Sequence, residues 1–519
     1  MKARTVAVCC GSALLSIALA ALLPGTGSLV QIVDAATECD RLASLALPNV
    51  TITSAQSVEA GAFAPPGAGG AALAAFQHLP KFCRVMATLK PSSDSAIKIE
   101  VWLPAAGWNR KYQAVGNGAF SGSIDYPAMA RALARGYAAS GTDTGHDGNT
   151  GSFAMGHPEK VIDFGWRAVH EMTATSKKVV ATYYEAAPTF SYWNGCSAGG
   201  RQAMKEAQQF PADFDGIIAG APGLDWTGRA AGAVRGAQAL QSNEAARLPA
   251  AKKQLLHQAV LQACDTLDGV KDGLIADPKQ CKFDPGVLQC KGADDASCLT
   301  PAQVNTARLL YSGKMNPKSK REITGLEPGS ELGWTDLGWT ASARATGLDE
   351  FRFLVFKDEK WDIGQFNFDT DIVRAEETDN NTINALDPNL KAFIARGGKL
   401  IQYHGWSDPQ ISPGNSTQYY QRVLDALGGP SRVTNSYRLF MAPGMGHCAG
   451  GEGPNTFDMV GALERWVEQG QAPDFILATH STNGRVDRTR PLCSYARVAV
   501  YRGTGSIDDA ASFSCQWPR

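Results

Sequence analysis

The chain has 519 residues, with 49 Lys and Arg against 50 Asp and Glu and a formal net charge of −1 at pH 7. This length suits one large α/β domain with an insertion, or two domains. The balanced charge argues against nucleic acid or a membrane surface as a partner.

The first 36 residues have the pattern of a secretory signal peptide. Met1-Lys2-Ala3-Arg4 is basic, residues 6–23 are mainly apolar, and Gly/Pro-rich sequence follows without a stop-transfer pattern. We therefore expect residues 1–36 to be removed, with cleavage near Ala20 or as late as Ala36, and the mature protein to be secreted or periplasmic. A lipoprotein anchor is the weaker alternative, because Cys9 and Cys10 precede most of the apolar run.

Cysteine usage predicts a disulfide framework. Of 12 cysteines, Cys9 and Cys10 lie in the expected signal peptide, and the remaining even number suits an exported protein. Sequence spacing suggests four nearest-neighbour pairs: Cys39 with Cys83, Cys264 with Cys281, Cys290 with Cys298, and Cys493 with Cys515. Cys196 and Cys448 are left over and lie far apart in sequence.

Strands and helices alternate in the first part of the mature chain. Residues 83–89, 97–103, 112–115 and 137–140 are β-rich, residues 164–184 carry a helical apolar stripe, and residues 190–193 and 214–222 give further strand patterns. Because the later strands are almost wholly apolar, this alternation predicts a mainly parallel sheet with helices on both faces.

Sheet character is interrupted between residues 226 and 390. This region has amphipathic helical stretches and long polar loops, and strand patterns resume at residues 399–403 and 437–441. We therefore predict a catalytic domain formed by residues 37–225 and 391–519. Residues 226–390 would be a lid inserted over the carboxyl ends of the strands, where ligands bind in open α/β sheets.

A nucleophile is suggested by the run Gly195-Cys196-Ser197-Ala198-Gly199. In such a Gly-x-Ser-x-Gly pattern the serine sits at a strained strand-to-helix turn with its hydroxyl projecting outward. The preceding residues favour a strand and the following residues favour a helix, as this turn requires. Similar pentapeptides also occur by chance in Gly-rich loops, so the remainder of the chain has to support the interpretation.

Each resumed strand leads into a candidate catalytic residue. Asp408 follows residues 399–403, and His447 lies in the Gly-rich loop after residues 437–441. Ser197, Asp408 and His447 thus occur in the order of the α/β-hydrolase fold, with histidine as the base and the carboxylate as its orienting partner. Asp225 is the alternative acid, since Asp408 before Pro409 could be a simple turn residue.

The two leftover cysteines flank this proposed triad. Cys196 precedes Ser197, and Cys448 follows His447. If serine and histidine lie within hydrogen-bond reach, their neighbours come close enough for a bridge, provided that the Cβ vectors cooperate. A Cys196–Cys448 disulfide is therefore predicted.

Two backbone amides are expected to bind the oxyanion of an acyl-transfer intermediate. One is the N–H of Ala198, which follows the nucleophile. The other comes from the Gly-rich loop at residues 116–122, where the amide of Gly118 or of Ala119 could serve. A plain flexible turn is the alternative interpretation of that loop.

An acidic loop at residues 264–277 is a candidate calcium site. Clustered carboxylates repel one another unless they are solvated or neutralised, and a hard cation with oxygen ligands would neutralise them. The spacing differs from that of an EF-hand, and a solvated loop is the alternative. The expected Ca²⁺ ligands are the carboxylates of Asp265, Asp268 and Asp272 and the carbonyls of Val270 and Leu274.

Four segments together resemble the tannase and feruloyl esterase family. They are Gly195-Cys196-Ser197-Ala198-Gly199-Gly200, Val115-Gly116-Asn117-Gly118-Ala119-Phe120, Gly141-Thr142-Asp143-Thr144-Gly145-His146 and Gly446-His447-Cys448. The resemblance covers residues 39–515. It implies a secreted α/β-hydrolase with an inserted lid, a structural Ca²⁺ in that lid, and a disulfide beside the serine and histidine. Ala119 stands where the family more commonly has another glycine.

The sequence thus predicts a serine carboxylic ester hydrolase that acts on small-molecule esters of phenolic or aromatic acids through an acyl-enzyme. Aromatic residues of the insertion are candidates to hold the acyl group, although most are expected to pack in a core. They are Phe351, Phe353, Phe356, Trp361, Phe366 and Phe368.

Two alternatives remain. The first is hydrolysis of mono(2-hydroxyethyl) terephthalate, to which the family extends; the free carboxylate of that substrate calls for a cationic partner, and Arg352 is a weak candidate. The second is a catalytically silent binding protein with the same fold. Such a protein would be expected to lack a triad member, and none is missing here.

Overall fold

The structure of the protein is a computed structural model that describes residues 38–67, 69–241, 243–337 and 345–518. The expected signal peptide at residues 1–36 lies outside the described residues. Ala36–Arg519 form one compact unit. Within the described ranges, no helix combines the length and the apolar character needed to cross a bilayer.

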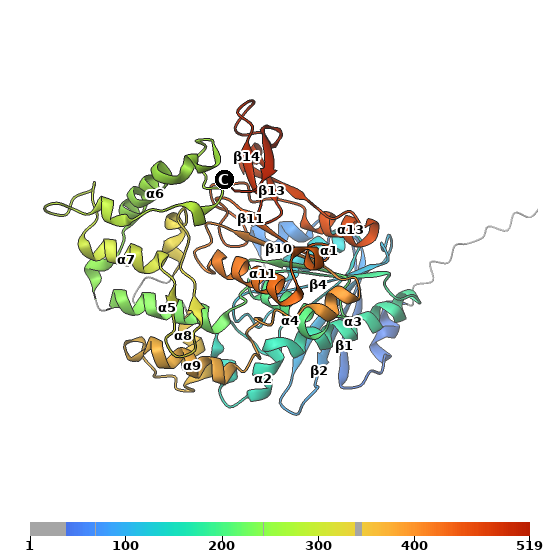
Figure 1. The fold of residues 1–519 in the computed structure, drawn as a ribbon. Helices are drawn as coiled ribbons and strands as arrows, with labels where there is room; N and C mark the ends of the chain where they lie inside the picture. Colours follow the sequence, from blue (N-terminus) through green and yellow to red (C-terminus); the bar gives the residue numbers. More distant parts are fainter. Residues whose placement is uncertain (1–37, 68, 242, 338–344, 519) are drawn as a thin grey trace, which may run out of the picture. The chain divides into compact units, whose positions relative to one another are not determined.

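A nine-stranded sheet with the order β1-β2-β3-β5-β4-β6-β7-β10-β11 organises this unit (Figure 1). The first strands pair antiparallel: β1 (Val50–Val58), β2 (Phe82–Leu89) and β3 (Ile97–Pro104), with β3 also antiparallel to β5. The others pair in parallel: β4 (Lys111–Val115), β5 (Ala138–Thr142), β6 (Phe190–Cys196), β7 (Gly216–Gly220), β10 (Lys399–Gly405) and β11 (Tyr437–Ala442). The predicted, mainly parallel sheet is confirmed, and β1 is an addition to it.

Helices cover both faces of the sheet. Successive side chains on a strand point to opposite faces, so two adjacent apolar residues enter two different cores. Ile217 and Leu400 belong to the core beneath α3 (Ala168–Tyr184), α4 (Ala198–Gln209) and α11 (Pro413–Leu427). Their neighbours Ile218 and Ile401 belong to the core beneath α1 (Tyr126–Ala134) and α13 (Met459–Gln469). This double burial explains why the later strands are almost wholly apolar.

A mainly helical segment lies between β7 and β10, on the left in Figure 1. It contains α5 (Trp226–Gln241), α6 (Ala250–Cys264), α7 (Pro301–Tyr311), α8 (Ala345–Asp349), α9 (Phe368–Asp379) and the short strands β8 (Lys314–Met315) and β9 (Glu322–Ile323). Phe351, Trp361, Phe366 and Phe368 are buried in its core, with Phe356 packed against it. The expectation that most of these aromatic side chains pack in a core is confirmed.

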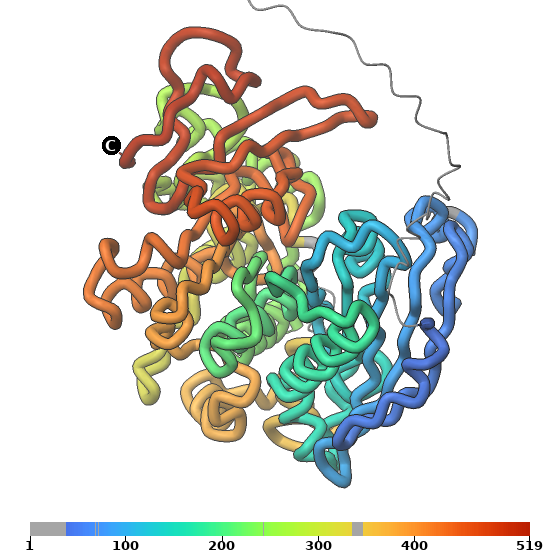
Figure 2. Tube along the Cα trace, turned by 90° about the vertical axis from the view of Figure 1, so that its right-hand side faces the viewer, coloured from blue at the N-terminus to red at the C-terminus, as the bar shows by residue number. Residues whose placement is uncertain are grey.

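Shorter helices and two hairpins complete the chain. The helices are α2 (Pro158–Ile162), α10 (Lys391–Ala395) and α12 (Pro430–Val433). One hairpin joins β12 (Phe475–Thr482) to β13 (Arg485–Cys493), and the other joins β14 (Val498–Tyr501) to β15 (Phe513–Gln516). These C-terminal strands, red in Figure 2, pack against the acidic loop that follows α6, since Val270 shares a core with Cys493, Ala499 and Phe513.

All five predicted disulfides are present. The structure joins Cys39 to Cys83, Cys264 to Cys281, Cys290 to Cys298, Cys493 to Cys515, and Cys196 to Cys448. Four of them close short or moderate segments. The bond between Cys196 and Cys448 spans 252 residues.

A buried histidine links the insertion to the loop after β11. His257 of α6 lies 2.7 Å from Glu331 of the 3₁₀ helix η9 (Glu331–Leu337) and 2.9 Å from Glu452. Glu331 is buried and also accepts a hydrogen bond from Tyr311 at 2.6 Å. Burial on its own would lower the pKa of His257, but the hydrogen bonds to Glu331 and Glu452 raise it to about 9.

We expect this histidine to make stability depend on pH. A histidine in the unfolded chain has a pKa of about 6.5, so its contribution is complete below that pH and is lost as the pH rises through about 9. His257→Gln should therefore lower the melting temperature at pH 6 and flatten its decline between pH 6 and 10. His78→Gln, at an exposed histidine, is the control. If the melting temperatures of wild type and His257→Gln ran parallel over this pH range, the proposed role of His257 in pH-dependent stability would be wrong.

Candidate active site

Ser197 occupies a sharp turn between β6 and α4. Its backbone has φ 64° and ψ −121°, a left-handed conformation that a non-glycine residue adopts only when the surroundings enforce it. The turn is tightly packed, because a Cβ on Gly195 would lie 2.6 Å from the carbonyl oxygen of Gly199. A Cβ on Gly199 would in turn lie 3.0 Å from the Cα of Gly116. The glycines that flank the serine are thus required by close approach of the backbone.

Asp408 and His447 form a hydrogen-bonded pair at the ends of two adjacent parallel strands. Asp408 follows β10, His447 follows β11, and Nδ1 of His447 lies 2.6 Å from Oδ2 of Asp408. Asp408 is completely buried, and its other oxygen accepts hydrogen bonds from the N–H groups of Gln410 (2.7 Å) and Ile411 (3.0 Å). This arrangement fixes the histidine ring with its other nitrogen available for chemistry.

The electrostatics keep Asp408 ionised despite its burial. Burial alone would raise the pKa of this carboxyl group, but the adjacent His447 and a second histidine, His404, hold it well below its usual range. Nε2 of His404 lies 3.0 Å from Oδ2 of Asp408, and its Nδ1 lies 2.7 Å from Oγ of Ser416. A carboxylate in this state stabilises a positive charge on His447.

Ser197 and His447 face one cavity of about 230 Å³. The cavity draws its walls from several separate segments of the chain. Its other lining residues are Ala119, Asn149, Trp226, Arg229, Thr346, Gln410 and Ile411. The structure therefore brings the three predicted triad residues to one place, with Asp408 beneath His447.

The disulfide between Cys196 and Cys448 connects the turn of Ser197 directly to the loop of His447. The two Cα atoms are 6.0 Å apart. Cys448 also has a positive φ of 64°, so each bridged segment contains one residue with a strained backbone: Ser197 itself in the first, and the neighbour of His447 in the second. A covalent bond at this position limits how far the two loops can separate.

Two predicted oxyanion donors lie next to the nucleophile. Ala198 is the first residue of α4, so its N–H has no acceptor within the helix. Ala119 lines the cavity and has a φ of 47°, whereas Gly118 is not among the lining residues. The loop of Ala119 is held by a hydrogen bond of 2.8 Å from Gln202 of α4 to Asn117.

Asp225, the alternative acid, serves a structural role. Its carboxylate accepts a hydrogen bond of 2.7 Å from the N–H of Gly228 and forms an ion pair with Arg321. The carboxylate that contacts His447 is that of Asp408. The two aspartates are therefore distinguished by their partners.

Several cavity residues were not anticipated from the sequence. Trp226 and Arg229 lie in the first turn of α5, after the loop that follows β7, and Ile411 follows β10. Their positions shortly after predicted strands were the one sequence feature that could have indicated them. The indole N–H of Trp226 donates to Glu350 at 2.9 Å, and the guanidinium of Arg229 lies 4.9 Å from the Trp226 ring centroid. Arg352 instead donates to the carbonyl of Trp361 at 2.8 Å, and it is not among the lining residues.

The acidic loop has buried carboxylates arranged around its own backbone. Asp265 accepts hydrogen bonds from the N–H groups of Asp272 (3.1 Å) and Gly273 (3.0 Å). Asp272 forms a 2.6 Å ion pair with Arg490 of β13. Burial raises the pKa of Asp268 to about 7, and the negative charges of Asp272 and Asp265 add to this effect. Carboxylate oxygens are the ligand type that Ca²⁺ prefers, but in this structure the three carboxylates do not converge at the spacing of metal ligands.

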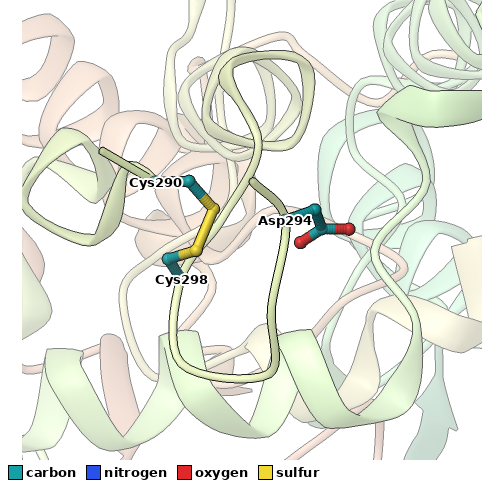
Figure 3. Close-up of side chains that lie close together, drawn as sticks. All are labelled: Cys290, Asp294 and Cys298. Atoms are coloured by element: carbon teal, nitrogen blue, oxygen red, sulfur yellow. A yellow bond between two sulfur atoms is a disulfide. The ribbon is translucent and has the colours of Figure 1, made fainter. Parts of the chain in front are cut away.

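Two side-chain groups in the described ranges have the spacing of metal ligands, and the carboxylates of the acidic loop are not among them. One is Cys290, Asp294 and Cys298 (Figure 3), but its two sulfurs are bonded to each other at 2.03 Å and offer no thiolate. The other is His170, Glu206 and Asp213, on the α3 and α4 side of the sheet, where His170 already hydrogen-bonds Asp213 at 2.7 Å.

Comparison with known proteins identifies the family of the chain. The sequence matches the family profile described as tannase and feruloyl esterase over residues 83–516. A protein of Xanthomonas campestris pv. campestris described as an uncharacterized esterase is 39% identical, over 95% of this chain and 93% of its own length. Probable feruloyl esterase B-1 of Aspergillus fumigatus is 31% identical, over 90% and 93% respectively.

Two solved structures have a fold similar to that of this chain. The crystal structure of feruloyl esterase B from Aspergillus oryzae matches with a TM-score of 0.87 and 30% identity, covering 92% of this chain and 99% of that chain. Tannin acyl hydrolase from Aspergillus niger matches with a TM-score of 0.75 at 20% identity, covering 91% and 93%, and so shares the fold.

We expect the reactivity of Ser197 to depend on Asp408 and not on Asp225. Asp408→Asn should slow labelling of the serine by a fluorophosphonate probe by about a thousandfold or more, because the histidine loses its orientation and its counter-charge. Asp225→Asn should lower the melting temperature through the lost Arg321 pair while labelling stays close to the wild-type rate. The reverse pattern would assign the acid to Asp225.

Proposed function

The chain belongs to the tannase and feruloyl esterase family and is a carboxylic ester hydrolase, and we propose that it cleaves esters of phenolic or aromatic acids through an acyl-enzyme on Ser197. The observation that carries this proposal is the 2.6 Å hydrogen bond between buried Asp408 and His447, at a cavity that His447 shares with Ser197. A serine is a weak nucleophile at neutral pH unless a base removes its proton.

Acylation would begin with attack of Ser197 Oγ on the ester carbonyl carbon. Nε2 of His447 takes the hydroxyl proton, and Asp408 stabilises the resulting imidazolium. The negative charge that develops on the carbonyl oxygen is received by the N–H of Ala198 and, from the opposite loop, that of Ala119. The C–O bond then breaks, and His447 returns its proton to the departing alcohol.

Deacylation repeats these steps with water in place of serine. His447 removes a proton from the water, which attacks the acyl-enzyme carbonyl, and the same two amides hold the oxyanion. Ser197 regains its proton from His447 as the acid leaves. Acylation and deacylation both use His447 as the base, so both steps depend on its orientation by Asp408.

The acyl group would lie against the apolar part of the cavity. Trp226 and Ile411 are almost fully buried and line it, so they give the cavity an apolar wall against which an aromatic ring can pack. Arg229 lies beside Trp226, which favours a second candidate, hydrolysis of monoesters of terephthalate with Arg229 facing the free carboxylate. Measuring kcat/KM for ferulate esters, gallate esters and terephthalate monoesters would show which of the two substrate classes the enzyme prefers.

A structural Ca²⁺ in the acidic loop is also part of the proposal. The carboxylates of Asp265, Asp268 and Asp272 and the carbonyls of Val270 and Leu274 would hold it. The ion would neutralise the desolvated carboxylates and cross-link a loop on which the C-terminal hairpins rest.

Five disulfides suit an oxidising compartment, so we propose that the protein works outside the cytosol, secreted or periplasmic.

Ser197→Ala should abolish hydrolysis of methyl ferulate, because the acyl-enzyme can no longer form. The melting temperature should stay near the wild-type value, since alanine keeps the Cβ and the same backbone conformation and only the hydroxyl group is lost. Ser44→Ala, at an exposed serine, is the matched control and should retain full activity. Turnover retained by Ser197→Ala would overturn the assignment of the nucleophile.

Removal of divalent metal with EDTA should lower the melting temperature, and added Ca²⁺ should restore it, because the ion stabilises only the folded loop. Elemental analysis of untreated protein should find calcium. Asp268→Asn should be less stable than wild type and insensitive to EDTA. An unchanged melting temperature together with metal-free protein would remove calcium from the proposal.

A further inference from the structure

A carboxylate is buried in the last turn of α4. Glu206 is 0% exposed, and neither of its carboxylate oxygens has a hydrogen-bond partner among the described residues. α4 ends at Gln209, so Glu206 also lies at the end of the helix where the main-chain carbonyl groups give a negative potential. Burial and position both disfavour an ionised carboxylate there unless a cation lies beside it.

Two further side chains that can bind metal surround Glu206. They are His170 of α3 and Asp213 of the loop after α4, and one ligand atom from each of the three residues lies within 4.8 Å of the others. The side chains of His170 and Asp213 are 33% and 16% exposed. Ions and water can therefore reach the group past these two residues, while Glu206 forms its buried end.

Aromatic packing holds the imidazole of His170 in place. The ring stacks on Phe210, with centroids 4.0 Å apart and planes inclined by 16°. Trp166 packs against Phe210 at a centroid distance of 5.5 Å. Because the histidine ring is already ordered, its use as a ligand would cost little additional side-chain entropy.

The charges of this group call for a divalent cation. With a neutral imidazole, the carboxylates of Glu206 and Asp213 contribute two negative charges. The nearby ammonium group of Lys177 donates to the main-chain carbonyl oxygen of Asp213, and burial lowers its pKa, so it is a weak counter-ion. In the absence of a metal, burial and the negative charge of Asp213 raise the pKa of Glu206 well above its usual value, and a proton takes the place of the cation.

The donor set distinguishes between metals. One imidazole nitrogen and two carboxylate oxygens suit Zn²⁺, which commonly binds three protein ligands and a water, whereas Ca²⁺ takes oxygen ligands. Two ligands of a tetrahedral zinc ion stand about 3.3 Å apart. This separation lies between the 2.7 Å contact of His170 with Asp213 and the 4.8 Å within which all three ligand atoms lie. Small side-chain rotations therefore suffice to form the site.

We propose that His170, Glu206 and Asp213 bind Zn²⁺, with water completing the coordination, and that the ion joins α3 to α4 and to the loop after α4. These residues are not among those that line the cavity of Ser197, so the ion would act on stability and not on the reaction. α4 begins directly after Ser197, and an ion near its other end would help to hold this helix in place.

The test uses Zn²⁺ itself and no substrate. Protein stripped with a chelator and returned to saturating Ca²⁺ should bind one equivalent of Zn²⁺ per chain in a calorimetric titration. Its melting temperature should rise by about 3 °C when the Zn²⁺ concentration is about a hundred times the Kd.

Two variants test the ligands. Glu206→Gln keeps the shape of the side chain and removes its charge, and His170→Gln removes the imidazole; each should weaken Zn²⁺ binding by about a hundredfold or more. His480→Gln is the matched control. His480 lies 2.6 Å from Asp487, and this histidine–aspartate pair is outside the groups that have the spacing of metal ligands.

A measurement on wild type alone remains decisive if a variant fails to fold. Co²⁺ bound at this site should absorb visible light several times more strongly than aqueous Co²⁺, because a site with four ligands lacks the inversion symmetry of the octahedral ion. Absorption no stronger than that of aqueous Co²⁺ would count against the site.

Binding of one Zn²⁺ that is lost in Glu206→Gln and His170→Gln and kept in His480→Gln would support the proposal. Failure of wild type to bind Zn²⁺, or equal binding by Glu206→Gln, would overturn it. A proton shared between Glu206 and Asp213 would then account for the buried carboxylate. Ser197→Ala should bind Zn²⁺ as wild type does, so the result is independent of the proposed function.

Discussion

The site depends on one buried negative charge. Asp408 is removed from water, which would make its ionised form costly without compensation. The compensation is local: two backbone N–H groups from the turn that follows, and two histidines that reach it from β10 and from the loop after β11. Since parallel strands deliver their carboxyl ends to one edge of the sheet, the fold supplies these partners from segments next to each other in space.

The insertion contributes part of the wall of the cavity that Ser197 and His447 line. The reacting groups come from turns at the strand ends, while Trp226, Arg229 and Thr346 come from the helices placed over them. The same insertion provides η9, which faces the loop of His447 across a separate cavity of about 240 Å³. His257, Glu331 and Glu452 hold these two walls together, so the shape of that space depends on a polar contact between insertion and catalytic core.

Sequence reasoning succeeded where local chemistry decides structure. The apolar strands, the glycines around Ser197, the order of serine, aspartate and histidine, and the cysteine spacing each follow from short-range requirements. The edge strand β1 was missed because its sequence is rich in Thr and Ser, and its alternation of apolar and polar residues stops at the irregularity after Ile52. The β12–β13 hairpin was missed although Asn483-Gly484 is a strong turn signal. The cavity walls were beyond reach, since Asn149, Trp226, Thr346 and Ile411 meet only through the tertiary arrangement.

The bond between Cys196 and Cys448 allows the insertion to change in sequence and length while the catalytic residues stay together. It closes a loop of 252 residues that contains the whole insertion, so the chain entering and the chain leaving that loop are fastened at the catalytic centre. Residues can be added, deleted or exchanged in the intervening helices without separating nucleophile from base. Lengthening a loop that is already closed costs little extra conformational entropy. Changes in the insertion can therefore alter substrate preference while the disulfide keeps the nucleophile and the base in place.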